Sequence, residues 1–208
     1  MTHHRHIKAG LVVALAGGAL MASGCGESVP APGAAKVSAR TDKVDSTRFL
    51  MRDGEQPGYR RVESVVTEDA ETFAEHARLT KAERRRMHSA GMGLATYQPT
   101  EGPNSRGVTS VTLFASAQGA RQWLAQEQRE DYVRRQMPEG GKLRRFVVPG
   151  IPGAHGWSAS KGSHIVGNIF WVQGRCLMTL GHESTGPFDG PLATGAHAIY
   201  QRTKGRCP

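Results

Sequence analysis

The sequence predicts an α+β fold, with a single antiparallel sheet and helices packed mainly on one face of it. Strand-like segments and amphipathic helical segments are mixed along the chain, as is typical of this class. The last strand-like segments are joined by short turns at 161–162 and 174–175, and such hairpins make neighbouring strands antiparallel. Residues 25–208 are enough for one domain with a hydrophobic core and few for two.

Two helices are expected in the first half of this part. Thr67 stands before a run of acidic residues, which suit the positive end of a helix dipole, so a first helix is expected to begin there. Thr80 and Glu83 have the spacing of a capping box, which predicts the start of a second helix. Gly91 is placed to end that helix.

A single long helix is expected over 117–136, with Ser116 as its N-cap, and a last helix over 192–202. The apolar residues of the long helix recur at helical spacing and predict its buried stripe: Ala120, Trp123, Leu124, Tyr132 and Val133. Its acidic residues are interpreted as an exposed face: Glu127, Glu130 and Asp131.

Strands are expected where short runs rich in β-branched and aromatic residues lie between turn residues. In chain order, the predicted strands are 59–66, 94–97, 108–114, 143–148, 157–160, 165–173 and 176–181. The last three are predicted to form an antiparallel meander.

The first 24 residues are interpreted as a signal peptide. Arg5 and Lys8 form a short positive segment, and the uncharged apolar run that follows, 9–22, is shorter than the roughly 20 residues that span a bilayer. One interpretation is an ordinary signal peptide, whose cleavage would leave Cys25 as a plain thiol. The other is a signal peptide that directs lipidation of Cys25.

The end of this run, Ala22-Ser23-Gly24-Cys25, resembles the lipobox of bacterial lipoproteins. Ser23 and Gly24 match that pattern, whereas Ala22 stands where leucine is usual. The resemblance implies that Cys25 is lipidated after cleavage and anchors the protein to the outer face of the cell membrane. Two or more acyl chains would make this anchoring durable.

Residues 25–46 are expected to form a flexible tether behind the lipidated cysteine, because they are rich in Pro, Ala, Gly and Ser and lack hydrophobic periodicity. Residues 47–208 are expected to form the single α+β domain. By composition, the tether has a reach of about 25 Å.

Cys176 and Cys207 are predicted to form a disulfide. The sequence has three cysteines, Cys25 is assigned to the lipobox, and an exported compartment permits disulfides. The alternative, Cys176 as a nucleophile, lacks a sequence context that would activate a thiol.

The chain carries a net charge of +9, and residues 25–208 retain 25 basic against 18 acidic residues. For an exported protein this surplus favours anionic lipid headgroups or envelope polymers over nucleic acid as neighbours. A solvated basic surface without a partner is the simpler interpretation of the same charges. Arg144 and Arg145, with Trp157 nearby, are the candidate binding residues on this basis.

The motifs of common enzymes and metal sites are not present in the sequence. There is no His-Glu-x-x-His, no Gly-x-Ser-x-Gly and no phosphate-binding glycine loop, so no catalytic residue, metal ligand or cofactor is assigned. A small envelope hydrolase that uses His164, His182 and Glu183, with or without a metal ion, is kept as an alternative.

Together, the lipobox, the tether and the small domain resemble uncharacterised cell-surface lipoproteins of streptomycete-like actinobacteria. The order of elements is also similar to the PsbP/Mog1-like domains of some mycobacterial lipoproteins. The resemblance implies membrane anchoring outside the cell. The leading interpretation is a non-enzymatic binding or interaction module at the cell envelope, with the hydrolase and a structural partner of a membrane complex as alternatives.

Overall fold

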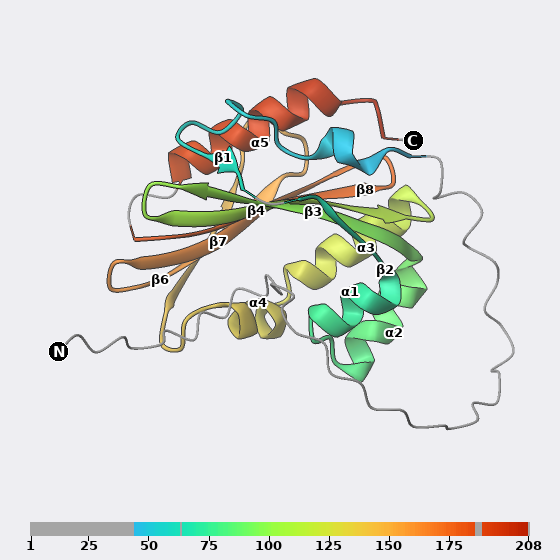
Figure 1. Ribbon diagram of the computed structural model, residues 1–208. Helices are drawn as coiled ribbons and strands as arrows, with labels where there is room; N and C mark the ends of the chain where they lie inside the picture. Colours follow the sequence, from blue (N-terminus) through green and yellow to red (C-terminus); the bar gives the residue numbers. More distant parts are fainter. Residues whose placement is uncertain (1–43, 63, 186–188, 208) are drawn as a thin grey trace, which may run out of the picture.

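The chain forms one antiparallel sheet with helices on both of its faces. The computed structural model describes residues 44–62, 64–185 and 189–207 (Figure 1). Within these residues the sheet has eight strands in the order β1-β3-β4-β8-β7-β6-β5, and β2 pairs with β3 beside β1. The predicted α+β class and single antiparallel sheet are confirmed. In the described ranges, no helix has the length and hydropathy needed to cross a membrane.

The strands place the middle of the chain at the centre of the sheet. Their bounds are β1 (Arg60–Arg61), β2 (Val66–Asp69), β3 (Met92–Gly102), β4 (Ser105–Phe114), β5 (Lys142–Val147), β6 (His155–Lys161), β7 (His164–Gln173) and β8 (Cys176–Ser184). The predicted meander is confirmed as β6, β7 and β8, which pair antiparallel in sequence order. β8 returns to pair with β4 and so joins the two halves of the sheet.

The prediction of one strand over 59–66 is wrong, because this segment forms two separate short strands on the same edge of β3. β1 pairs with residues 100–101, and β2 pairs with residues 94–97. Pro99 lies between these two stretches, and its carbonyl accepts from the amide of Val62 at 3.4 Å. Because proline has no N–H to donate back, the ladder is interrupted there.

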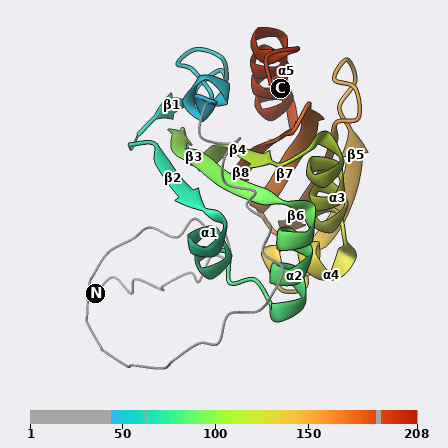
Figure 2. The same cartoon turned by 90° about the vertical axis from the view of Figure 1, so that its right-hand side faces the viewer.

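The helices form two layers, one on each face of the sheet. The first layer consists of α1 (Ala70–His76), α2 (Lys81–Ala90), α3 (Ala117–Glu127) and α4 (Glu130–Gln136), and the second of α5 (Asp189–Thr203) with a 3-10 helix (Ser46–Phe49). Figure 2 shows the sheet between these layers, with β1 and β2 at one edge and β5 at the other. Of the five α-helices in the described residues, four thus lie on one face, as predicted.

Two hydrophobic clusters fill the space on either side of the sheet, because successive strand residues point to opposite faces. Beneath α5, the cluster includes Phe49, Ile151, Trp171, Met178, Leu192 and Ile199. Beneath α1–α4, it includes Met87, Phe114, Trp123, Trp157, Phe170 and Leu177. The sheet therefore presents two separate faces, each with its own helical cover.

The helix ends follow the capping signals in part. Thr80 and Glu83 form a complete capping box at the start of α2, and Gly91 ends α2 in the left-handed conformation, so both predictions are confirmed. α1 is capped by Asp69 and not by Thr67. Ser116 caps α3 as predicted.

The prediction of one helix over 117–136 is wrong, since the chain leaves helical geometry between α3 and α4. Arg129 has extended backbone angles, φ −63° and ψ 137°, and opens α4 without a side-chain cap. Tyr132 and Val133 of α4 are buried. The turn lets α4 pack over the sheet, and tertiary packing here overrides a sequence of good helix formers.

Gly119 sets the close contact between α2 and α3, which yields a testable prediction. A Cβ atom at Gly119 would lie 1.9 Å from the carbonyl oxygen of Ala90. Gly119→Ala is therefore expected to lower the free energy of unfolding by about 2 kcal/mol, because two backbones would have to separate. Chemical denaturation measures this loss. Gln118→Ala, on the exposed side of α3, is the control and should change stability by less than about 0.5 kcal/mol.

Candidate functional site

A cleft lies between the sheet and the layer of α1–α4, and we call it the helix-side cleft. Its volume is about 390 Å³. Its polar lining includes Arg78, Glu83, Ser110, Glu127, Asn168 and Thr179, and its apolar lining includes Phe73, Tyr132 and Phe170. The volume falls within the range of small-molecule sites.

The floor of the cleft is built by the register of the three central strands. Ser110, Thr179 and Phe170 lie directly opposite one another on β4, β8 and β7. Gly181 is the register partner of Asn168, and a Cβ at Gly181 would lie 2.6 Å from the Asn168 side-chain oxygen. The glycine therefore leaves room for the amide beside a row of hydroxyl groups.

Glu127 lies at the C-terminal end of α3 and lines the cleft. Only 9% of it is exposed, so the expectation that it belongs to an exposed helix face is wrong. The Tyr132 hydroxyl donates to one of its carboxylate oxygens at 3.3 Å. Burial raises the pKa of Glu127 to about 7, against hydrogen bonds from Trp123 and Tyr132 that lower it. Glu127 is thus a buried carboxyl group whose neighbouring donors are neutral.

The spacing of the apolar stripe could have identified Glu127 as buried. Trp123 precedes it by four residues and Leu124 by three, so all three share one face of α3. By contrast, Glu130 and Asp131 are exposed, as expected.

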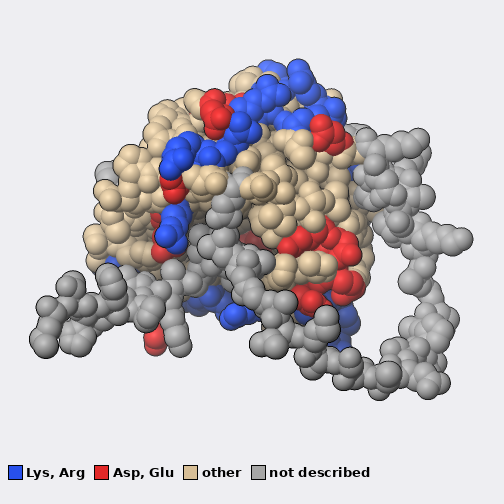
Figure 3. Space-filling model, viewed as in Figure 1, with Lys and Arg blue, Asp and Glu red and all other residues tan. Residues whose placement is uncertain are grey.

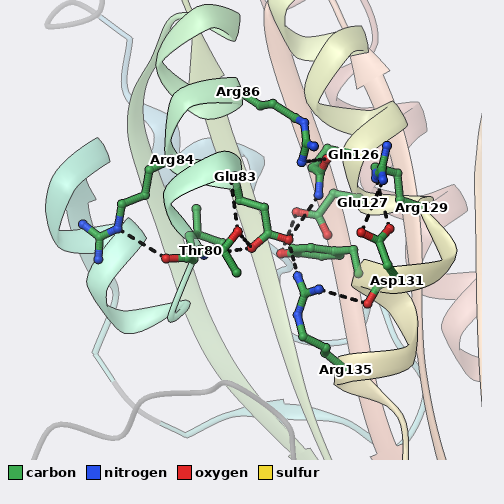
Figure 4. A network of polar contacts seen from close by, with 11 residues as sticks. Thr80, Glu83, Arg84, Arg86, Gln126, Glu127, Arg129, Asp131 and Arg135 are labelled. Atoms are coloured by element: carbon green, nitrogen blue, oxygen red, sulfur yellow. Dashed lines mark hydrogen bonds and ion pairs between the residues drawn. The ribbon is translucent and has the colours of Figure 1, made fainter.

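Glu83 is the centre of a polar network that ties α2 to α3 and α4 (Figure 4). Its Oε2 accepts from the amide of Thr80 at 2.9 Å and from the Thr80 hydroxyl at 2.8 Å. Its Oε1 accepts from Gln126 at 3.3 Å and from the guanidinium of Arg135. Arg86 donates in turn to Gln126 at 3.1 Å. Glu83 and Arg135 thus line the cleft as a pair that already neutralises itself.

Arg78 lies in the short connection between α1 and α2. It adopts a left-handed backbone with φ 50°, which is a conformation that favours glycine. Its side chain is exposed and lines the cleft. Among the residues that the structure describes, no ion pair or hydrogen bond involves its guanidinium group. The cleft therefore holds an unpaired cation at its rim and an unneutralised carboxyl group in its wall.

The predicted binding residues Arg144, Arg145 and Trp157 lie outside the helix-side cleft. Arg144 lies over the ring of Phe146, 5.4 Å from its centroid. Arg145 is adjacent in the strand and points to the opposite face. It pairs in register with the buried Trp157 and lines a small hollow with it. The two arginines therefore do not act on one face of the sheet.

The three residues of the hydrolase alternative do not converge. His164 Nε2 lies 3.5 Å from a carboxylate oxygen of Glu183. His182 is the next residue to Glu183 in β8, so its side chain points to the other face, where it hydrogen-bonds to the Tyr59 hydroxyl. Burial lowers the pKa of His182 to about 4. The described residues contain no group of His, Cys, Asp or Glu that could hold a metal ion.

The predicted disulfide is present. Cys176 and Cys207 are bonded, with their Cα atoms 6.1 Å apart, and the bond ties the chain beyond α5 to the start of β8. Cys25, the predicted lipidation site, lies outside the described residues. So do the signal peptide and most of the predicted tether.

Charged side chains are unevenly distributed over the face shown in Figure 3. Basic residues gather over α5 and the 3-10 helix, where Arg48, Arg52, Lys204 and Arg206 are exposed. Acidic residues gather near α1, where Asp69, Glu71 and Glu75 are exposed. Basic residues are also exposed on the helices that cover the cleft, among them Lys81, Arg85, Arg121 and Arg134, so the positive charge is not confined to one layer.

Of three comparisons with known proteins, only the comparison with solved structures gives a match. No protein-family model and no curated protein matches the chain. Among solved structures, the fold is similar to the extracellular domain of PknH from Mycobacterium tuberculosis, with a TM-score of 0.49 and 8% sequence identity. The match covers 76% of this chain and 94% of that chain. The likeness to PsbP/Mog1-like domains stays a prediction.

Proposed function

We propose that this protein is a lipid-anchored extracytoplasmic binding module and that the helix-side cleft is its ligand site. The observation that carries the binding role is the cleft itself, because it combines a volume of about 390 Å³ with convergent polar groups from three strands. Concave sites of this kind, with a few polar groups on an otherwise apolar lining, are typical of small-molecule recognition.

The location is supported by the sequence and by the disulfide. The lipobox-like Ala22-Ser23-Gly24-Cys25 follows a signal-peptide pattern. The buried Cys176–Cys207 bond suits an oxidising compartment outside the cytoplasm.

The membrane partner is supported by the place where the tether joins the domain. The described chain begins at Val44, which packs against the cluster beneath α5. Arg48, Arg52, Lys204 and Arg206 are exposed on this layer, and each such residue near an anionic membrane contributes about 1 kcal/mol. In the orientation that we propose, the layer of α5, to which the tether joins, faces the lipid headgroups, and the helix-side cleft faces away from the membrane.

The binding role is tested by filling the cleft. Thr179 is half-buried on the floor, and Thr179→Trp is expected to occupy the space of the ligand. After incubation with envelope extract, we expect the variant to retain about one tenth or less of the small-molecule ligand that the wild type retains. Mass spectrometry quantifies the retained ligand. Arg144→Ala, outside the cleft, is the control and should retain ligand like the wild type. Equal retention by the Thr179 variant would exclude the cleft as the site.

Anchoring is tested separately. Cys25→Ser removes the thiol that would carry lipid, so the protein is expected to move from the membrane fraction to the medium. Immunoblotting of the two fractions measures this change. A Cys25→Ser protein that stays membrane-bound would contradict lipid anchoring.

A further inference from the structure

The charges of the helix-side cleft leave one acid and one base without a partner of opposite charge. Glu83 and Arg135 are bonded to each other and so do not need a ligand ion. Glu127 is buried among neutral donors, and Arg78 is exposed at the rim. A ligand that complements both groups must carry a positive and a negative charge.

The rest of the cleft lining suits a ligand that forms hydrogen bonds and stacks on aromatic rings. The residues that β4, β7 and β8 contribute to the cleft are uncharged, and they include Ser110, Thr112, Asn168 and Thr179. Phe73, Tyr132 and Phe170 supply the aromatic walls. Hydroxyl and amide groups can pair with a peptide bond, and aromatic walls can hold an apolar side chain.

The backbone of Arg78 adds an independent argument. A residue that follows a helix in the left-handed conformation is usually glycine, because a Cβ atom is sterically disfavoured there. Arg78 has this conformation, and no hydrogen bond of its side chain within the described residues compensates for it. Such strain is expected where a residue has a role in a site.

We propose that the helix-side cleft binds a zwitterionic small molecule, an amino acid or a short peptide, whose ammonium group meets Glu127 and whose carboxylate meets Arg78. This inference rests on the proposed function, since it names the ligand class of the same cleft. The ammonium group donates to a carboxylate that the protein itself leaves without a cation, and the carboxylate accepts from the guanidinium at the rim.

The direction in which ligand affinity changes with pH distinguishes this proposal from others. The charged groups that line the cleft with Glu127 are Glu83 from α2, Arg135 from α4 and Arg78 from the rim, and the lining strands add neutral groups. The Glu83 carboxylate helps to raise the pKa of Glu127, whereas a bound ammonium group would lower it. Binding therefore releases a proton, and affinity rises as pH rises toward the unbound pKa of about 7.

The experiment uses the purified full chain and the twenty glycyl-Xaa dipeptides as probes. We expect at least one to bind in calorimetry, with N-acetylation or C-amidation of that dipeptide each weakening binding by about tenfold or more. From about pH 5.5 to 7 the probe keeps both charges, and its affinity should rise by at most about tenfold per pH unit. The binding heat should differ between Tris and phosphate, because a proton is released.

Two variants separate the site from general stability. Glu127→Gln keeps the shape of the side chain and should remove both the pH dependence and the buffer-dependent heat. Arg78→Gly should melt at the same or a higher temperature than the wild type and yet bind about tenfold more weakly. Arg78→Lys keeps the charge and should retain most of the affinity.

Four results would overturn the inference: no bound dipeptide, an affinity that falls as pH rises, full binding by the N-acetylated probe, or Glu127→Gln that binds like the wild type. A neutral saccharide or a simple anion that binds in the cleft in place of dipeptides would overturn the zwitterion and leave the proposed binding function intact. If Thr179→Trp and Glu127→Gln both retain ligand like the wild type, the zwitterion inference and the proposed binding function are both excluded.

Discussion

Replacing Cys176 and Cys207 together with alanine is expected to lower the free energy of unfolding by about 3.5 kcal/mol. The disulfide joins residues 31 apart in the chain, and opening such a loop restores conformational entropy to the unfolded state. For a domain of this size, the loss corresponds to a fall in Tm of roughly 7–14 °C. Differential scanning calorimetry of the double variant measures it.

Reduction of the disulfide in the wild-type protein provides the control for this prediction. Dithiothreitol should lower the Tm of the wild-type protein by a similar amount and leave the double variant unchanged. Alanine is preferred to serine because both positions are buried, with 0% and 8% of each residue exposed. A double variant that melts within 2 °C of the wild type would show that the bond contributes little to stability.

Glu83→Gln is expected to lower the free energy of unfolding by about 3 kcal/mol. The carboxylate is buried, and it accepts from Thr80, Gln126 and Arg135 at once. An amide cannot accept at both positions, and its loss of charge leaves Arg135 without its counter-ion. Denaturant titration measures the loss.

Glu130→Gln is the matched control. Glu130 pairs with Arg134 one helical turn away, but both side chains are about 60% exposed. The same substitution there should cost no more than about 0.5 kcal/mol. Equal losses at both positions would contradict a special role of the buried network.

The pH dependence of the two proteins gives a further check on Glu83. Burial acts to raise the pKa of this carboxyl group, yet hydrogen bonds from Thr80 and the charge of Arg135 hold the pKa below its usual value of 4.5. A lowered pKa in the folded state means that the stabilisation is complete above 4.5 and is lost as pH falls through the lowered value. The difference between the wild type and Glu83→Gln should therefore shrink in acid.

Much of the fold could be predicted because its signals are local. The capping box of Thr80 and Glu83 lies within four residues, and Gly91 ends α2 by its own conformational freedom. The hairpins of β6, β7 and β8 follow from short turns between alternating segments. By contrast, the end of α3 depends on how α4 packs, and no residue near Gln128 would stop a helix by itself.

The cleft could not be predicted because it depends on strand register. Ser110, Asn168 and Thr179 are far apart in the sequence, and their alignment results from β8 pairing with β4 and β7. The basic residues of 142–145 were more conspicuous, yet alternation along β5 sends Arg144 and Arg145 to opposite faces. Charge alone therefore pointed to a strand other than the three that form the floor of the cleft.

The position of the disulfide has a mechanical consequence for a tethered protein. Tension on the chain at Val44 acts first on the layer of α5, where Arg202 donates to the Leu50 carbonyl at 2.7 Å and Arg48 donates to that of Arg206 at 2.9 Å. The Cys207 bond carries this load to Cys176 at the start of β8, which is hydrogen-bonded to strands on both sides. A load that passes through this bond therefore reaches a central strand of the sheet, from the face opposite α1–α4 and the cleft.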